Sequence, residues 1–317
     1  MLPPFFVTKL PGGIGNQLFS LFASRYLAQE SGRINFLDFG SVDYSHHTTK
    51  YDVSEFELRN HELTLAPENK RGLIFNAISR MHDLKFRLGS RSQALAKPLK
   101  VYSCELEPLN SARVTSMISD ISRCKHLSVF SSISGYFPDF SFFDKLNDAE
   151  GKVLVVKNPS NQFIKLYQYL ASRRVLGVHI RLKDYLIHPT TIGNLTRNYF
   201  LSCIFEALLR QDYDEIWFFS DSPHEALERF KGVELGKKVR FVGMDESLTP
   251  CEELSLLQEC TGIVCSNSTF SFWAAKFMSE RDGNSHVYIP DSFRKDGKAR
   301  IHGLPTSWKS CPVEWIY

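Results

Sequence analysis

The sequence predicts an α/β protein of two domains, each built on a parallel sheet with helices on both faces. Residues 5–38 begin with an apolar run, a glycine-rich turn, an amphipathic stretch and a second apolar run, the pattern of a βαβ unit. From residue 174 onward, short apolar runs alternate with single helical patterns, as in a doubly wound sheet. The 317 residues are enough for two domains of roughly 150 residues.

Composition excludes several other classes of protein. Hydrophobic residues make up 43% and charged residues 23%, with a net charge of +3, which argues against disorder and against a nucleic-acid-coating protein. The seven cysteines are odd in number and form no C-x-x-C pair, so neither a disulfide framework nor a structural zinc site is expected. We also expect no signal peptide and no membrane span, and therefore a soluble protein in a reducing compartment.

The elements follow from the hydrophobic periodicity. In the first half we expect a strand at 5–7, a helix from about 18 to its end at Gly32, and a strand at 34–38. Between the halves, residues 151–172 are predicted to form a linker. A capping box, Ser222 to Glu225, is expected to open one helix of the second half. The predicted strands of the second half are 174–181, 215–219, 239–242, 262–265 and 286–289, and the predicted helices are 198–210, 223–230, 251–260 and 270–278.

Open parallel sheets bind ligands beyond the carboxyl ends of their strands, and four segments there carry polar chemistry. In the first, Gly13 lets a ligand approach the backbone at a helix start, and Asn16 with Gln17 offers amides for hydroxyl groups. A plain tight turn is an equally good interpretation. The segment is not the dinucleotide fingerprint, because Leu18 stands where glycine or alanine is needed, although Asp38 resembles a ribose-binding acid.

The second segment is a strand end. Alternation places His179 and Arg181 on one face, where an arginine can bind a phosphate through two hydrogen bonds. Asp184 is expected to orient Arg181 or His179, or to accept a proton. The alternative is an Arg–Asp pair that merely closes the strand.

The third and fourth segments are helix starts. Ser268, Thr269 and Phe270 begin a helix after a strand, and their hydroxyl and backbone N–H groups suit a diphosphate. Simple N-capping is the alternative. Glu253 can accept hydrogen bonds from the N1–H and amino group of a guanine, or act only as a partner of the helix dipole. Residues 212–214 resemble a metal-binding D-x-D but precede a strand, so we assign no metal.

In this order, the segments resemble the α-1,2-fucosyltransferase family of bacteria and animals. The segments that carry the resemblance are Gly12 to Phe19, Gly135 to Phe137, His179 to Tyr185, Phe219 to Ser222, and Asn267 to Ala275. The resemblance implies a GT-B fold, with two Rossmann-like domains facing a central cleft. Residues 1–160 would form the acceptor-side domain and residues 173–317 the domain that binds GDP-fucose.

The resemblance also implies an activity. The enzyme would be an inverting galactoside 2-α-L-fucosyltransferase, moving L-fucose from GDP-β-L-fucose to the 2-hydroxyl of a terminal β-galactoside without a metal or other cofactor. Arg181 would contact the leaving diphosphate, His179 the nucleotide, and Ser268 or Thr269 the phosphates. The family usually has a second arginine where Leu182 stands.

The resemblance finally implies a setting, a bacterial cytoplasmic enzyme of O-antigen or other surface-polysaccharide synthesis with a lipid-linked acceptor. Residues 71–100 carry seven Lys or Arg against one acid along an apolar stripe, and are expected to contact the inner membrane peripherally. An ordinary helix with a basic solvated face is the alternative. Two other functions stay open, a nucleotide-dependent oxidoreductase, suggested by the first βαβ unit, and a non-catalytic protein that binds sugar or an anionic surface.

Overall fold

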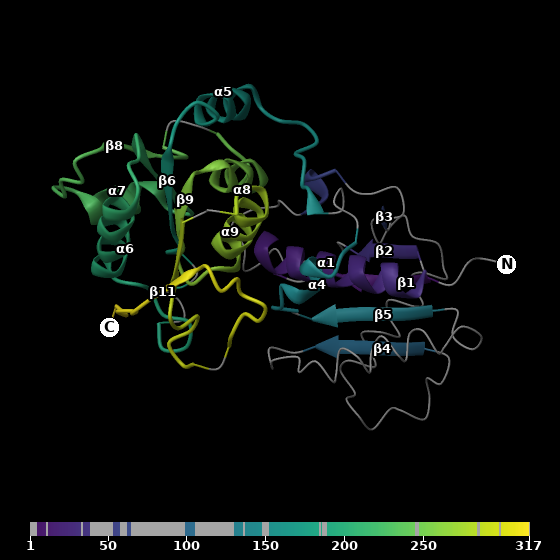
Figure 1. Ribbon diagram of the computed structural model, residues 1–317. Helices are drawn as coiled ribbons and strands as arrows, with labels where there is room; N and C mark the ends of the chain where they lie inside the picture. Colours follow the sequence, from purple (N-terminus) through teal and green to yellow (C-terminus); the bar gives the residue numbers. More distant parts are fainter. Residues whose placement is uncertain are drawn as a thin grey trace. The chain divides into compact units, whose positions relative to one another are not determined.

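The computed structural model separates the chain into two compact units (Figure 1). The N-terminal unit comprises Met1–Ser45 with Leu58–Lys152, and the C-terminal unit comprises His46–Glu57 with Val153–Tyr317. The structure describes residues 5–10, 12–32, 34–38, 53–57, 62–64, 99–104, 130–135, 137–147, 152–183, 185, 189–244, 247–283, 286–297 and 299–316. Side chains are described for all of these except residues 5–6, 62–64, 99–104 and 130–135. Asp184 and nearly all of the basic stretch 71–100 lie outside the described residues.

The N-terminal unit holds a parallel sheet of order β3-β2-β1-β5-β4. Its elements are β1 (Phe5–Lys9), α1 (Ile14–Ser31), β2 (Ile34–Asp38), β3 (Glu62–Thr64), β4 (Leu99–Cys104), β5 (Phe130–Gly135) and the short α4 (Ser141–Asp144). Aromatic side chains of α1 pack against those around α4: Phe19 lies 4.9 Å from Phe140 and Phe22 lies 4.8 Å from Phe143, centroid to centroid. The predicted βαβ unit is confirmed.

The C-terminal unit holds a six-stranded parallel sheet of order β11-β10-β9-β6-β7-β8. Its strands are β6 (Val175–Ile180), β7 (Glu215–Ser220), β8 (Lys238–Phe241), β9 (Gly262–Val264), β10 (His286–Pro290) and β11 (Lys309–Cys311). Its helices are the short η2 (Val53–Glu55), α5 (Asn161–Leu170), α6 (Arg197–Arg210), α7 (Pro223–Phe230), α8 (Pro250–Glu259) and α9 (Thr269–Arg281). Counted from β6, this is the strand order of a Rossmann fold. The two parallel α/β units confirm the predicted fold class, α/β with two Rossmann-like domains.

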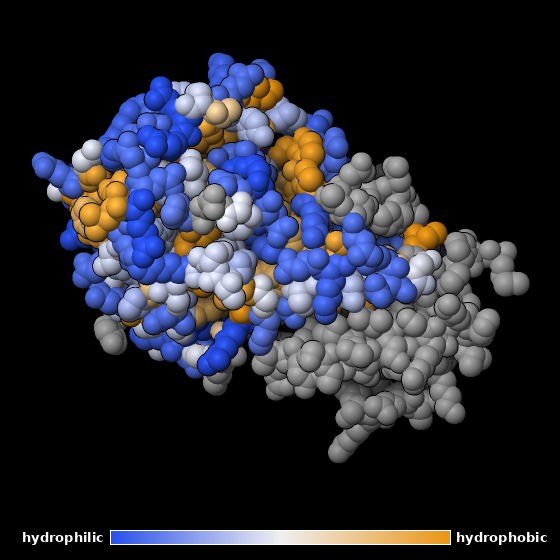
Figure 2. Space-filling view, in the orientation of Figure 1, coloured by the Kyte–Doolittle hydropathy of each residue, from blue (hydrophilic) through white to orange (hydrophobic). Residues whose placement is uncertain are grey.

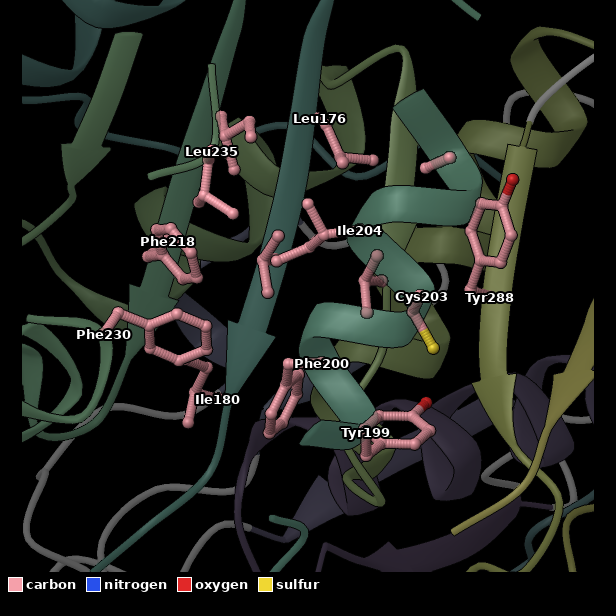
Figure 3. Close-up of a cluster of buried hydrophobic side chains, with 14 of the residues drawn as sticks. Leu176, Ile180, Tyr199, Phe200, Cys203, Ile204, Phe218, Phe230, Leu235 and Tyr288 are labelled. Atoms are coloured by element: carbon pink, nitrogen blue, oxygen red, sulfur yellow. The ribbon is translucent and has the colours of Figure 1, made fainter. Parts of the chain in front are cut away.

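One face of β6 packs into the core of the C-terminal unit, and the other face carries His179 and Arg181. Leu176 and Ile180 point into a hydrophobic cluster with α6 and α7 (Figure 3), and Val178 belongs to the same cluster. The alternate residues therefore face the other way. Gly177 faces α8 so closely that a Cβ atom there would lie 2.6 Å from Leu257 Cδ1. His179 and Arg181 share that second face.

Two local predictions are wrong. The segment predicted as a linker contains α5, which buries Phe163, Leu166 and Leu170 and is capped by the Ser160 hydroxyl. The capping box at Ser222 does not form, because the Ser222 N–H donates to Ser220 Oγ and its hydroxyl makes no cap bond. A capping box forms instead at α8, between Thr249 and Glu252.

The described surface is mostly hydrophilic in the view of Figure 2, with separate apolar areas. The large apolar side chains that are exposed include Phe205 and Leu209 of α6 and Ile164 and Tyr167 of α5. Among the helices of the described residues, none has the length and apolar character that a bilayer crossing requires.

Candidate functional site

The candidate site lies where the strand order of the C-terminal sheet reverses. Strand β6 pairs with β7 on one side and with β9 on the other, and Val178 stands opposite Val264. The chain therefore leaves the carboxyl ends of β6 and β9 in opposite directions, and such a switch point is where open α/β sheets bind ligands. The structure brings the predicted strand-end segment, His179 to Arg181, beside the predicted helix start, Ser266 to Phe270.

Arg181 is held by a carboxylate from the neighbouring strand. Its Nε lies 3.3 Å from Asp221 Oδ2, and the two side chains are 27% and 14% exposed. The pairing follows from the register, since Ile180 stands opposite Ser220 and the next residues along both strands are Arg181 and Asp221. The guanidinium is thus fixed at the carboxyl end of β6, while part of the side chain stays accessible to solvent.

Asp221 also fixes the backbone that follows Arg181. Its carboxylate accepts the N–H of Leu182 at 2.9 Å and that of Lys183 at 3.2 Å. This is the orienting role that the sequence predicted for Asp184, whose own role stays a prediction. Asp221 belongs to a segment that carried the family resemblance, but its partner is visible only in the strand register.

Tyr185 links the two segments of the site. Its ring centroid lies 5.8 Å from the Arg181 guanidinium carbon, and its hydroxyl donates to the carbonyl oxygen of Asn267 at 2.8 Å. The Asn267 side chain is also used structurally: its amide donates to the carbonyl oxygens of Gly193 (3.1 Å) and Ile192 (3.4 Å). These bonds hold the turn after β9 against the chain that follows β6.

His179 is buried beneath this edge. It is 4% exposed, its Nδ1 lies 2.8 Å from Ser266 Oγ, and its ring stacks on Phe270 at 5.1 Å. Burial, with a smaller contribution from the Arg181 charge, lowers the pKa of His179 to about 3. The imidazole is therefore neutral near pH 7, and it connects β6 to the turn that precedes α9.

The buried imidazole predicts a dependence of stability on pH. Because the pKa of His179 is about 3 in the folded protein, against about 6.5 when unfolded, only the unfolded chain takes up this proton as the pH falls below about 6.5. Stability is therefore lost progressively toward acid, by about 1–2 kcal/mol near pH 5. Urea unfolding at several pH values measures it, and His179→Gln should flatten the slope. If His179→Gln has the same slope of stability against pH as the wild type, the pKa of His179 is not lowered in the folded protein.

The amino end of α9 lacks a side-chain cap. Ser268 is its N-cap residue, but its hydroxyl makes no cap hydrogen bond, so the alternative of simple N-capping by Ser268 is wrong. The Ser271 hydroxyl donates instead to the carbonyl oxygens of Ser268 (3.0 Å) and Ser266 (3.3 Å). An anion that binds at this helix start would therefore not have to displace a Ser268 cap.

Two neighbouring glutamates at the start of α8 have different environments. Glu252 is buried and bonded on both sides, since its carboxylate accepts the N–H of Ser160 (2.6 Å) and of Thr249 (2.8 Å). Glu253 is half-buried, and its Oε1 would lie 3.4 Å from a Cβ atom built on Gly243, just beyond the carboxyl end of β8. Glu253 is therefore at the same sheet edge as Arg181, as predicted from the sequence.

In the N-terminal unit, a hydrogen bond from the Gln17 side chain stabilises the glycine-rich turn. Gly12 has φ 74°, a conformation that favours glycine, and Gln17 Nε2 donates to its carbonyl oxygen at 2.8 Å. Gly13 is the N-cap residue of α1 and has no side chain to cap the helix. Asn16 follows in the first turn and is half-buried. The Gln17 amide thus serves the turn, while Gly13 and Asn16 stay candidates for binding.

The D-x-D segment lies at the opposite edge of its sheet, as predicted, because β7 begins after it. Asp212 forms ion pairs with Arg174 (3.0 Å) and Lys237 (2.7 Å), and Asp214 accepts the Arg174 N–H. Within the described part of the chain, no cluster of three or more histidine, cysteine, aspartate or glutamate side chains suits a metal ion.

Several solved structures are similar to this chain at low sequence identity. A mutant of Arabidopsis thaliana FUT1 in complex with GDP is 12% identical, with a TM-score of 0.49 over 88% of this chain and 69% of that one. The fucosyltransferase NodZ from Bradyrhizobium is 13% identical, with a TM-score of 0.49 over 87% of this chain and 93% of that one. POFUT1 in complex with GDP-fucose is 12% identical, with a TM-score of 0.49 over 87% and 95%. No curated protein matches the chain significantly.

The sequence match to a family model covers the site itself. Residues 166–298 match the model of glycosyl transferase family 11, and this range contains Arg181, Asp221, Glu253 and the start of α9. The predicted family resemblance is thereby confirmed over these residues. Over residues 166–298, the chain is similar to glycosyl transferase family 11, which supports a glycosyltransferase.

Proposed function

We propose that this glycosyltransferase moves L-fucose from GDP-β-L-fucose to the 2-hydroxyl of a terminal β-galactoside, with inversion at the anomeric carbon. The observation that carries the proposal is the placement of Arg181. Asp221 fixes its guanidinium at the switch point of the sheet, beside a helix start with no side-chain cap. This arrangement presents a permanent positive charge and backbone N–H groups to one small region, which suits a diphosphate.

The donor would bind along the carboxyl edge of the C-terminal sheet. Arg181 and the first turn of α9, with Ser268 and Thr269, would bind the diphosphate. Glu253 would accept the N1–H and amino group of guanine, a pair of donors that uracil and adenine do not present together. A carboxylate at that position therefore supports GDP over UDP or ADP as the nucleotide.

The reaction would be a single displacement. The acceptor oxygen bonds to the anomeric carbon while the bond from that carbon to the diphosphate breaks, and GDP leaves with the electron pair. The negative charge that develops on GDP is stabilised by Arg181, so the scheme includes no metal. The proton of the acceptor hydroxyl passes to a general base, for which Asp184 is our candidate. With a pKa of about 3, His179 is a weak base, so we propose that it positions the turn before α9.

The acceptor side is proposed for residues 1–160, with Gly13 and Asn16 at the turn that begins α1. A lipid-linked oligosaccharide of O-antigen or another surface polysaccharide would be the acceptor. The enzyme would then work in the cytoplasm, with peripheral membrane contact through residues 71–100. This setting follows from the family resemblance and from the basic composition of that stretch.

The test is a transfer assay with acceptors that differ in one hydroxyl. The purified protein is incubated with GDP-fucose and a methyl β-galactoside, its 2-deoxy analogue or its 6-deoxy analogue, before and after dialysis against EDTA. We expect a product heavier by one deoxyhexose with the parent and 6-deoxy compounds but not with the 2-deoxy compound, and no effect of EDTA. A product from the 2-deoxy compound would contradict the linkage, and loss of activity in EDTA would contradict the metal-free scheme. GDP-mannose serves as the donor control.

A further inference from the structure

We propose that Arg294, in the loop after β10, provides a second guanidinium for the donor diphosphate. This inference rests on the proposed function and deepens it. The family pattern has a second arginine directly after the first, but Leu182 stands there in this chain. Leu182 is 1% exposed and belongs to the hydrophobic core, and Lys183 after it is exposed. A second fixed cation would therefore have to come from another part of the sheet edge.

The loop 291–297 follows the carboxyl end of β10, and Arg181 lies at the same end of the sheet. Strand β10 pairs in parallel with β9, and β9 pairs with β6, so the carboxyl end of β10 is two strands from Arg181. Phe293 packs edge-on against Phe272 of α9, with ring centroids 5.5 Å apart. Phe272 is one turn beyond Ser268, and its N–H donates to the Ser268 carbonyl oxygen. Arg294 thus follows a residue that contacts the first turns of the helix proposed to bind phosphate.

Two sets of hydrogen bonds connect the backbone of this loop, through residues 191–193, to the turn after β9. The N–H groups of Lys295 and Asp296 donate to the carbonyl oxygens of Ile192 and Thr191, at 3.1 and 3.2 Å. The Asn267 amide in turn holds Ile192 and Gly193. The carbonyl oxygen of Arg294 itself accepts two bonds, from Ser292 Oγ (2.8 Å) and from the Gly297 N–H (3.0 Å). Arg294 therefore stands on a fixed backbone.

The guanidinium of Arg294 has an unused donor. Its Nη2 pairs with Asp296 Oδ2 at 2.7 Å, and the two side chains are 19% and 15% exposed. Its Nε is buried and has no hydrogen-bond partner among the residues that the structure describes. A buried guanidinium N–H without an acceptor destabilises the folded protein, because the group loses its hydrogen bonds to water and forms none in the protein. An anionic ligand at this edge would supply the missing acceptor.

Nucleotide titration tests the assignment. GDP and GMP are titrated calorimetrically into the wild-type protein, Arg294→Gln, and Arg300→Gln as the matched control, since Arg300 is exposed on the same connection. Loss of a charge-assisted hydrogen bond should weaken GDP binding by about tenfold or more in Arg294→Gln. GMP, with one phosphate, should lose much less, and Arg300→Gln should bind both as the wild type does. Equal GDP affinity in Arg294→Gln and the wild type would overturn the inference.

A second variant separates ligand binding from loop stability. Asp296→Asn breaks the ion pair of the loop but keeps the Arg294 guanidinium. If Arg294 serves the diphosphate, Asp296→Asn should keep its GDP affinity. If the pair only stabilises the loop, both variants should lose GDP affinity alike, and the inference fails. A wild-type protein that binds no GDP would overturn the proposed function itself, which distinguishes the two failures.

Discussion

Arg181→Lys is expected to lower kcat for fucosyl transfer by about 10²–10³-fold while the protein stays folded. Lysine keeps the charge but loses the planar fork, so it cannot hold Asp221 and two phosphate oxygens in the same geometry. Stabilisation of charge that develops in a transition state is worth about 3–4 kcal/mol when one donor is removed. Initial rates at saturating GDP-fucose measure the effect, and thermal unfolding reports on the fold.

The matched control for this variant is Arg174→Lys. Arg174 stands just before the same strand, at the opposite edge of the sheet, and pairs with exposed Asp212. Exposed ion pairs contribute little to stability, and this one is far from the carboxyl edge, so transfer should be unchanged. Full activity in Arg181→Lys, or an equal loss in Arg174→Lys, would remove Arg181 from the mechanism.

Asp221→Asn is expected to lower kcat/KM for GDP-fucose by about 10–100-fold and to destabilise the fold by about 1–3 kcal/mol. The carboxylate accepts from Arg181 and from the backbone N–H groups of Leu182 and Lys183. An amide keeps the shape but turns one acceptor into a donor that faces other donors. Arg181 then loses its fixed orientation although its charge remains.

The control for Asp221→Asn uses the other end of the same strand. Asp214 precedes β7, is exposed and accepts the Arg174 N–H at 2.8 Å. Asp214→Asn should cost little stability and leave kcat/KM unchanged. If Asp221 has only a structural role, Asp221→Asn will be less stable but will transfer fucose at the wild-type rate when folded. That result would contradict the positioning role.

Hydrophobic periodicity predicted the elements of the C-terminal unit well. Runs such as Val175–Ile180 and Glu215–Ser220 are buried throughout, which produces the continuous apolar pattern of parallel strands. Strand β11 was missed because its three residues, Lys309–Cys311, carry too little pattern to detect. Helix α5 was missed although its buried side chains Phe163, Leu166 and Leu170 have the helical spacing of three and four. The exposed apolar residues Ile164 and Tyr167 lie between them and obscure the pattern.

Within the candidate site, the sequence predicted which segments meet but not how their side chains pair. Strand alternation put His179 and Arg181 on one face, and the structure agrees. The partnership of Arg181 with Asp221 depends on the register between β6 and β7, which no local pattern encodes. For the same reason the roles of Gln17 and Asn267 in holding turns could not be predicted, since their acceptors are carbonyl oxygens rather than recognisable side chains.

The central claim is that the diphosphate of the donor binds at the carboxyl ends of β6 and β9. A crystal structure of the protein with GDP tests it most directly. The account predicts that phosphate oxygens lie within hydrogen-bond distance of the Arg181 guanidinium and the first-turn N–H groups of α9, with guanine at Glu253. A diphosphate bound elsewhere on the chain, with Arg181 still paired to Asp221 and touching no phosphate, would contradict it.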